Sequence, residues 1–422
     1  MFISFSRLNM SLPTQDNREQ TEDIRGSGVK FSQLNLKPYL VTSLQAVNFI
    51  TATPIQEKTI PIALTLVDIV ARAKNGTGKT GAFLIPILNQ IKPQINTIQA
   101  VIVVNTRELA MQISSVTQNL GKLVNGVQNR VMCLVGGNSH GDDIMRINQY
   151  NPSILIATTL KLRVFLQEKL INLSQTKILV ADEADKIIQQ HEPLADLLII
   201  KSHMHKDHQT MIFSATYQSE VQQFTQLHMT NPEFINCQQD KLTLSGITQY
   251  VAQVRQQDLK FKLLMILFKH LQIRQAIIFV NSTQRCEQIH HLVQSQLEIP
   301  SSFVHSKLTQ FERSKVFHEF SQQNTRILVA TDLYTRGIDI RTVNVVINFD
   351  VPRYADDYLH RIGRCGRFGH KGLAITFQSG PAELETCQAI DEMLNSPMIP
   401  LPSDLKKIPN SQYAILDSDI KF

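Results

Sequence analysis

Short apolar runs, rich in Val and Ile, alternate along the chain with longer amphipathic stretches. In the first half these runs are AVIVVN (100–105), SILIAT (153–158), KILVAD (177–182) and TMIFSA (210–215). The rhythm then restarts with AIIFVN (276–281), TRILVATD (325–332), VNVVINFD (343–350) and GLAITF (372–377). Such runs are typical of strands buried on both faces, and their alternation with helical stretches indicates parallel sheets covered by helices. The pattern therefore predicts two α/β units in tandem.

Between the two series lies a segment, 231–254, that contains Pro, Gly and polar clusters and shows no helical period. Domain boundaries fall in stretches of this kind. Residues 1–29 are polar without periodicity, which predicts a disordered N-terminal arm. We therefore expect a first domain at 30–236, a linker at 237–247 and a second domain at 248–422.

Most of the predicted strands run directly into polar residues. The clearest case is KILVADEADK (177–186), where a buried strand ends in Asp182, Glu183 and Asp185. In parallel sheets, ligands bind at the carboxyl ends of the strands, because the loops that lead into the helix N-termini gather there. Asp182 could hold Mg²⁺ and Glu183 could orient or deprotonate an attacking water. The alternative is purely structural, since acids also suit the dipole of a helix N-terminus.

The stretch ARAKNGTGKT (71–80) matches a phosphate-binding loop, with Ala73 where the pattern's first Gly usually stands. Gly76 and Gly78 allow backbone N–H groups to close on phosphate oxygens, Lys79 can reach the β and γ phosphates, and the Thr80 hydroxyl can bind Mg²⁺. A surface turn before a helix is the alternative. The strand that ends in acids farther along the chain favours a nucleotide site. A GTPase is disfavoured because the chain contains no Asn-Lys-x-Asp motif.

The composition is that of a folded protein with more than one domain. The chain has 422 residues, 43% of them hydrophobic, and this length exceeds what single cores usually reach. Its formal charge of +6 permits a polyanionic partner without requiring one. The five Cys lack C-x-x-C spacing, which argues against disulfides and a zinc site and favours a reducing compartment. No apolar run approaches the ~18 residues of a membrane span and no signal peptide is recognisable, so we expect a soluble, intracellular protein.

Taken together, the motifs resemble those of the DEAD-box ATP-dependent RNA helicases over about residues 30–420. The four letters themselves stand at 182–185. The other motifs follow in the family's order: FITATPIQ (49–56), AKNGTGKT (73–80), TRELA (106–110), Gly136-Gly137, SAT (214–216), Gln310 and Arg313, TRGID (335–339) and HRIGRCGR (360–367). Stretches such as LTLSGITQYVA and HRIGRCGRFGHKGLAI further resemble the decapping-activator and translational-repressor branch.

The resemblance implies two tandem RecA-like domains that use ATP and Mg²⁺. Gln56 would pair with the adenine edge and Phe49 would stack on its ring, although a capping Gln and a core Phe are the alternative. Asp339 would take a ribose hydroxyl, and the arginine fingers would reach the γ phosphate from the second domain. The residues implied in ATP binding are Phe49, Gln56, Gly76, Thr77, Gly78, Lys79, Thr80, Asp339, Arg364 and Arg367. Those implied in catalysis are Lys79, Asp182, Glu183, Arg364 and Arg367, with Thr80 and Asp182 on the metal.

The resemblance also implies that single-stranded RNA crosses both domains. The implied contacts are Thr106, Arg107, Gly137, Thr158 and Lys161 in the first domain and Gln310, Arg313, Thr335 and Gly337 in the second. Contacts to phosphates carry no sequence information, so binding should be weakly sequence-selective and salt-sensitive. Hydrolysis should require the domains to close, because the two halves of the ATP site lie on different domains. The implied coupling residues are Asp185, Ser214, Thr216, His360 and Arg361.

Several positions depart from the family's pattern. Asn105 and Ala52 each replace a Pro, and TTLK (158–161) stands where the family has Thr-Pro-Gly-Arg. Leu160 replaces a Gly that permits close approach of a phosphate, and Lys161 keeps the charge but loses the planar fork of Arg. We therefore expect these departures to weaken RNA binding more than nucleotide chemistry.

Two functions fit these motifs. The first is an RNA-stimulated ATPase that remodels short duplexes or ribonucleoproteins, with a role in mRNA decay and translational repression as the branch implies. The second is a slow-hydrolysing RNA clamp that serves as an assembly platform. For both, the branch implies mRNA and decay and repression proteins as partners, no membrane contact, a monomer, and a cytoplasmic location that includes cytoplasmic mRNP granules.

Overall fold

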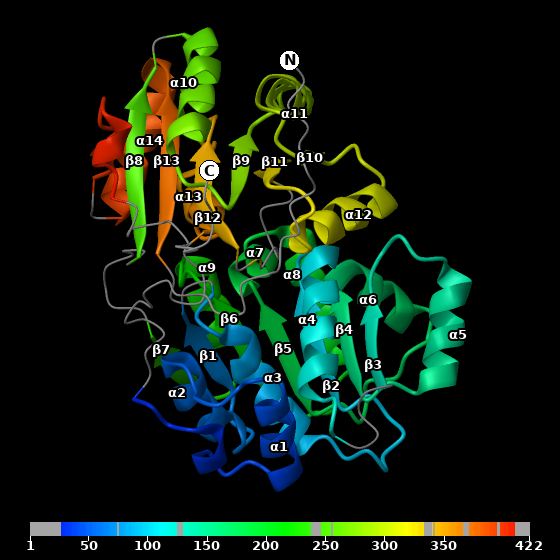
Figure 1. Cartoon of the computed structure of the whole chain (residues 1–422). Helices are drawn as coiled ribbons and strands as arrows, with labels where there is room; N and C mark the ends of the chain where they lie inside the picture. Colours follow the sequence, from blue (N-terminus) through cyan, green and yellow to red (C-terminus); the bar gives the residue numbers. More distant parts are fainter. Residues whose placement is uncertain are drawn as a thin grey trace.

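Two parallel sheets of seven strands each form the centre of the computed structural model (Figure 1). The structure describes residues 27–73, 76–124, 130–237, 246–254, 256–332, 340, 342–365, 371–394 and 397–409, apart from the side chains of Gln257, Gln310 and Asp356. Every strand pairing in the two sheets is parallel. The prediction of two α/β units in tandem is confirmed.

The first sheet has the strand order β3-β4-β2-β5-β6-β1-β7. Its strands are β1 (Ile69–Arg72), β2 (Ala100–Val104), β3 (Val131–Leu134), β4 (Ile154–Thr158), β5 (Ile178–Asp182), β6 (Gln209–Ser214) and β7 (Glu233–Asn236). A 3-10 turn at Phe31–Gln33 precedes the helices α1 (Pro38–Ala46), α2 (Pro54–Ala63), α3 (Lys79–Gln90), α4 (Arg107–Leu120), α5 (His140–Tyr150), α6 (Thr159–Gln167), α7 (Ala184–Ile188), α8 (His191–Ser202) and α9 (Ser219–His228).

The second sheet repeats this plan in the order β10-β11-β9-β12-β13-β8-β14. Its strands are β8 (Ile247–Gln253), β9 (Gln275–Val280), β10 (Ser301–Val304), β11 (Ile327–Thr331), β12 (Val343–Asn348), β13 (Gly372–Gln378) and β14 (Ile399–Pro400). The helices are α10 (Gln257–His270), α11 (Thr283–Leu297), α12 (Gln310–Ser321), α13 (Ala355–Ile362) and α14 (Gly380–Leu394), followed by a 3-10 turn at Leu405–Lys407. None of the helices in the described ranges is long and apolar enough to cross a membrane.

Each sheet is buried on both faces. Successive residues of β2 belong alternately to two hydrophobic clusters, with Ala100, Ile102 and Val104 in one and Val101 and Val103 in the other. The same alternation holds in β9 of the second sheet. Successive side chains of a strand point to opposite faces, so the helices on each side of a sheet complete a separate core. This double burial explains why the central strands read as continuous apolar runs.

All eight runs predicted as strands are strands in the structure, whereas β1, β3, β7, β8, β10 and β14 were not evident from the pattern. Two of these, β7 and β8, lie within the segment 231–254. Both are only partly buried, and β7 lies at the edge of its sheet, so neither requires a continuous apolar run. Residues 1–26 and 238–245 lie outside the described ranges. The N-terminal arm and the linker at 237–247 therefore stay predictions.

The strand order brings distant polar strand ends together at the carboxyl edge of the first sheet. Arg72, the last residue of β1, pairs in register with Ser214, the last residue of β6. Asp182, the last residue of β5, pairs with Phe213 of β6. The ends of β1, β6 and β5 are therefore consecutive neighbours, and the phosphate-binding loop, the acids and the segment after β6 begin from adjacent strands.

Candidate nucleotide and RNA site

The phosphate-binding loop connects β1 to α3. Gly76 and Gly78 have φ values of 77° and 100°, in the left-handed region that favours glycine, and Thr77 lies between them. Helix α3 begins at Lys79, whose side chain is 7% exposed and donates from Nζ to the carbonyl of Ala73 at 2.9 Å. The segment thus has the order of strand, glycine turn and helix that a phosphate-binding loop requires.

Gln56 is buried against this loop. Its Oε1 accepts the N–H of Thr53 at 3.0 Å at the start of α2, and its Nε2 donates to the Gly78 carbonyl at 3.0 Å. A Cβ atom on Gly78 or Gly81 would lie 2.6 Å from Gln56 Nε2, so a side chain at either position would displace the amide from this place. Gln56 therefore caps the start of α2, as the structural alternative expected. The same amide also contacts the phosphate-binding loop, which is where an adenine-reading residue should lie.

Phe49 lies beside the first turn of α3. Its ring stacks on that of Phe31 with 6.1 Å between the centroids, and its Cε1 would lie 3.6 Å from a Cβ atom on Gly81. The ring is half-buried, so one part of it packs in the core and another part remains open. Phe49 and Gln56 share Gly81 as a neighbour, and the fold has therefore brought the two predicted adenine contacts together on the first turn of α3.

The acids at the end of β5 are buried. Asp182 is 4% exposed and Glu183 is 8% exposed. Burial raises the pKa of Asp182 to about 6, and the nearby Lys79 ammonium opposes this shift. Glu183 has a φ of 50° and donates its N–H to Asp182 Oδ1 at 2.9 Å, while its own Oε2 is buried without a hydrogen-bond partner. Strained backbone and unpartnered buried carboxylate oxygens are costly, and such features cluster at functional sites.

The residues available for Mg²⁺ fit that ion in chemical type. Mg²⁺ takes oxygen ligands, and proteins usually hold it through one or two side chains together with substrate phosphates and waters. The Thr80 hydroxyl, on the half-buried second residue of α3, and the Asp182 carboxylate supply such oxygens. Within the described ranges, no group of three His, Cys, Asp or Glu residues could hold a metal ion.

Asp185 bonds to the neighbouring strand. Its Oδ1 accepts the Ser214 hydroxyl at 2.7 Å, and its Oδ2 lies 3.7 Å from Lys186 Nζ. The Ser214 Oγ in turn accepts the N–H of Thr216 at 3.2 Å. The three predicted coupling residues of the first unit therefore form one chain of hydrogen bonds. This chain fixes the segment after β6 relative to the acids.

In the second unit, Arg361 lies at the centre of a buried network. It is fully buried, and its Nε and Nη2 pair with the two carboxylate oxygens of Asp332, with 2.6 Å between Nη2 and Oδ2. Nη1 donates to the Asp350 carbonyl at 2.6 Å and Nη2 to Asn281 Oδ1 at 2.7 Å. Arg361 thus ties α13 to the segments after β9, β11 and β12. The sequence had marked these three partners only as polar strand ends.

Arg364 follows Arg361 closely and is 2% exposed. Its Nε donates to the carbonyl of His360 at 3.0 Å, and the His360 side chain is buried as well. The contact of His360 with the SAT segment stays a prediction. Four predicted site residues lie outside the described ranges, so their roles also stay predictions: Thr335, Gly337, Asp339 and Arg367.

The predicted RNA contacts of the first unit lie at the carboxyl edge of the sheet, after β2, β3 and β4. Thr106 caps α4 with its hydroxyl, and Thr158 occupies the N-cap position of α6. Gly137 has a φ of 99°. A Cβ atom on Gly136 would lie 2.7 Å from Arg107 Nη2, so the guanidinium lies directly over the glycine turn. The fold therefore brings Arg107 to the Gly136-Gly137 turn from a separate connection.

The TTLK segment gives Lys161 a protein partner. Its Nζ lies 3.1 Å from Oδ2 of Asp143, a fully buried carboxylate on α5, and 4.8 Å from the ring centroid of Phe165. Only 14% of the Lys161 side chain is exposed. A phosphate contact by Lys161 stays a prediction, because this pair would have to open. Leu160, by contrast, is 57% exposed on the first turn of α6, where the family has a Gly.

In the second unit, α12 begins at Gln310. The half-buried Arg313 donates from Nε to the Leu308 carbonyl at 3.1 Å and from Nη2 to the Ser306 carbonyl at 2.6 Å. The guanidinium thus fixes the turn that leads into the helix. The Gln310 side chain lies outside the described part of the chain, so its RNA contact stays a prediction.

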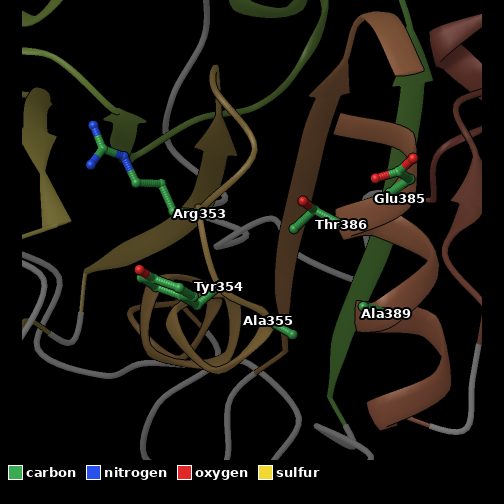
Figure 2. A pocket seen from close by; sticks show the side chains of 6 residues that line it. All are labelled: Arg353, Tyr354, Ala355, Glu385, Thr386 and Ala389. Atoms are coloured by element: carbon green, nitrogen blue, oxygen red, sulfur yellow. The ribbon is translucent and has the colours of Figure 1, made fainter. Parts of the chain in front are cut away.

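A surface pocket of the second unit involves none of the predicted site residues. The segment at the start of α13 and the outer face of α14 line it with Arg353, Tyr354, Ala355, Glu385, Thr386 and Ala389 (Figure 2). No acid, lysine or glycine turn of the phosphate site contributes to its lining. The pocket is therefore separate from the nucleotide chemistry.

Comparison with known proteins assigns the family. The family model for DEAD/DEAH box helicases matches residues 53–224, and that for the helicase conserved C-terminal domain matches residues 259–369. ATP-dependent RNA helicase DHH1 of Scheffersomyces stipitis is 44% identical over 400 residues, which cover 94% of this chain and 77% of that protein. The chain belongs to the DEAD/DEAH box helicase family. The probable ATP-dependent RNA helicase ddx6 of Dictyostelium discoideum is also 44% identical and covers 94% of this helicase and 92% of its own length. The predicted family and branch are confirmed.

Solved structures of DEAD-box proteins share the fold of this helicase. S. cerevisiae Dbp5 bound to RNA and ADP BeF3 is 28% identical and covers 90% of this chain and 97% of its own, with a TM-score of 0.80. A DEAD box protein from Methanococcus jannaschii is also 28% identical and covers 88% of this chain and 99% of its own, but its TM-score is 0.55. The predicted tandem RecA-like fold is confirmed.

Proposed function

We propose that the protein is an ATP-dependent RNA helicase, an RNA-dependent ATPase that binds single-stranded RNA across both units and remodels short duplexes or ribonucleoproteins. The observation that carries this proposal is the pair of buried acids beside the phosphate-binding loop. Asp182 lies within electrostatic reach of Lys79, and Glu183 keeps a buried carboxylate oxygen without a partner. Such an oxygen is well suited to accept a hydrogen bond from a water molecule.

In the proposed reaction, the loop N–H groups and Lys79 bind the phosphates of ATP. Lys79 Nζ would exchange its bond to the Ala73 carbonyl for phosphate oxygens. Thr80 and Asp182 would hold Mg²⁺, which neutralises charge on the β and γ phosphates. Glu183 would orient the attacking water and accept its proton. Burial of Glu183 keeps bulk water away from this oxygen and preserves its orientation.

The second unit would supply the arginine fingers Arg364 and Arg367. Helix α13, which leads to them, is fixed to the second sheet by the pairing of Arg361 with Asp332. Arg364 should therefore move with the second unit, and hydrolysis should depend on closure of the two units.

RNA would lie along the carboxyl edges of the sheets. The glycine turn at Gly137, the guanidinium of Arg107 and the hydroxyls of Thr106 and Thr158 are suited to phosphates rather than to base edges. Binding should therefore be weakly sequence-selective and should fall as salt rises. The first domain would comprise 30–236 and the second 248–422.

The relatives named DHH1 and ddx6 support a role in mRNA decay and translational repression. The proposed partners are mRNA and proteins of decay and repression. The proposed location is the cytoplasm, including cytoplasmic mRNP granules, and the proposed state is a monomer.

The test is steady-state ATP hydrolysis measured against a titration of unstructured RNA, for the parent and for Glu183→Gln. Parental turnover should rise with RNA. The variant should still bind ATP and RNA but hydrolyse about 10²- to 10⁴-fold more slowly, since an amide cannot accept the proton. Glu192→Gln, an exposed acid on α8, is the matched control and should retain the parental rate.

The outcomes separate the alternatives. A Glu183→Gln variant with the parental rate would remove Glu183 from the mechanism. Parental turnover that RNA leaves unchanged would contradict an RNA-dependent ATPase. RNA binding that depends on ATP, combined with turnover that stays very slow at saturating RNA, would favour the clamp and assembly platform.

A further inference from the structure

Phe311 is an exposed aromatic residue on the first turn of α12. Its side chain is 79% exposed, the largest fraction among the large apolar side chains in the described ranges. It directly follows Gln310 and lies two residues before Arg313, both of which are predicted RNA contacts. A single exposed apolar side chain is common and needs no explanation by itself. Its surroundings decide whether it has a ligand.

The backbone that carries Phe311 is firmly held. The Thr309 hydroxyl accepts the N–H of Glu312 at 3.3 Å, and Glu312 Oε2 accepts the N–H and the hydroxyl of Thr309 at 2.7 Å each. Arg313 is bonded to the carbonyls of Leu308 and Ser306. Thr309, Glu312 and Arg313 therefore direct their side chains to the turn and the helix cap. The ring faces solvent on a fixed scaffold, so little ordering would be needed when a ligand binds.

Cations flank Phe311 along the sequence. Lys307 and Lys315 are exposed, and Arg313 is half-buried between them in sequence. The nearest acid, Glu312, is engaged at the helix cap, and the contact of Lys315 with Glu319 is long, at 3.9 Å. Surfaces that bind single-stranded nucleic acids combine cations, which follow the phosphates, with aromatic rings on which bases stack.

An apolar protein partner is less well matched to this surface. Protein-docking patches gather several exposed apolar side chains. On α12 and the turn before it, Phe311 is the one large apolar side chain that is exposed, among the side chains that the structure describes. An isolated exposed ring with cations close to it in sequence suits a single flat base better than an apolar protein surface.

We propose that Phe311 stacks on one base of the bound RNA strand. This inference rests on the proposed RNA-binding function and adds to it a contact that phosphate recognition does not supply. Stacking does not read base edges, so binding should remain tolerant of sequence. The contact would also offset part of the loss of RNA affinity that is expected from the TTLK segment.

The test uses the full chain, a non-hydrolysable ATP analogue and labelled single-stranded RNAs of roughly ten nucleotides, within the range that such sites cover. One set of RNAs carries a single abasic position that is moved along the strand. The variants are Phe311→Ala, Phe311→Tyr and, as a matched control, Tyr354→Ala, which removes another exposed ring of the same unit. Circular dichroism and binding of the ATP analogue verify that each variant is folded.

Stacking predicts a specific pattern of affinities. Phe311→Ala should weaken binding of intact RNA by about 5- to 30-fold, and in the parent one abasic position should cause a loss of similar size. Combining the two changes should cost no more than either alone, because both remove the same contact. Phe311→Tyr and Tyr354→Ala should bind within about twofold of the parent, since the first keeps an aromatic ring and the second lies elsewhere.

Three results would overturn the proposal. If Phe311→Ala binds intact RNA as tightly as the parent, the ring has no base partner, and RNA binding as a function still stands. If Phe311→Ala weakens every abasic RNA by the same factor as intact RNA, the loss does not pass through a base. If the parent shows no RNA binding that depends on the ATP analogue, the proposed function fails together with this inference.

Discussion

The TTLK segment allows one prediction to be developed from the structure. Leu160→Gly removes a side chain that is 57% exposed on the first turn of α6, and it should let an RNA phosphate approach the backbone N–H groups there. Lys161→Arg should change little. The fully buried Asp143 carboxylate, 3.1 Å from Lys161 Nζ, should hold the new guanidinium as it holds the ammonium.

The size of the effect is set by one hydrogen bond from the backbone of α6 to an RNA phosphate. A hydrogen bond to a charged group contributes about 1.5 to 3 kcal/mol. Ordering the helix end around Gly should cost up to about 1 kcal/mol of this stabilisation. With the full cost subtracted, the net change of about 0.5 to 2 kcal/mol corresponds to RNA binding about 2- to 30-fold tighter for Leu160→Gly. Thr159→Pro fits the first helical position, so the triple variant with Pro, Gly and Arg at 159–161 should match Leu160→Gly alone.

Fluorescence anisotropy with labelled single-stranded RNA and a non-hydrolysable ATP analogue, at fixed salt, measures these affinities. Leu227→Gly, which removes an exposed Leu from α9 of the same unit, is the matched control and should bind RNA like the parent. If Lys161→Arg alone tightened RNA binding, the ammonium would not be committed to Asp143 as the structure indicates. If Leu160→Gly bound RNA no better than the parent, the exposed Leu would not be an obstacle to the phosphate.

Three further predictions concern other parts of the chain. Arg364→Ala should abolish most RNA-stimulated turnover while ATP binding by the first unit is retained, and unchanged turnover would mean that the units do not close as proposed. Asp332→Asn leaves the fully buried Arg361 without its carboxylate and should lower the free energy of unfolding by about 2 kcal/mol. This is less than for a fully buried pair, because Asp332 is 33% exposed. Thermal unfolding followed by circular dichroism would show no shift if the pair were unimportant. Burial raises the pKa of Cys286 to about 12, so its thiol should stay protonated at pH 8. It should therefore react with iodoacetamide more slowly than the half-buried Cys237. Mass spectrometry of the labelled peptides would show equal rates if this were wrong.

The sequence by itself determined the secondary-structure plan and most of the nucleotide-site chemistry. A strand that is buried on both faces must be apolar at successive positions. Runs such as 100–105 and 276–281 can therefore be recognised as strands without reference to the rest of the chain. The phosphate-binding loop at 71–80 was readable for a similar reason, since its chemistry depends on backbone N–H groups and side chains that are close in sequence. β1, β3 and β10, of four residues each, were too short to give such a signal.

Only the tertiary structure decided which side chains meet. Gln56 bonds to Gly78 across 22 residues, and Arg361 bonds to Asp332 across 29. Nothing in the sequence pattern singles out Asp143, yet the packing of α5 buries it and pairs it with Lys161, a predicted RNA contact. Contacts of this kind leave no periodic trace along the chain. Their strength depends on distance, burial and orientation, which do not exist until the strands have taken their order and the helices have packed on them.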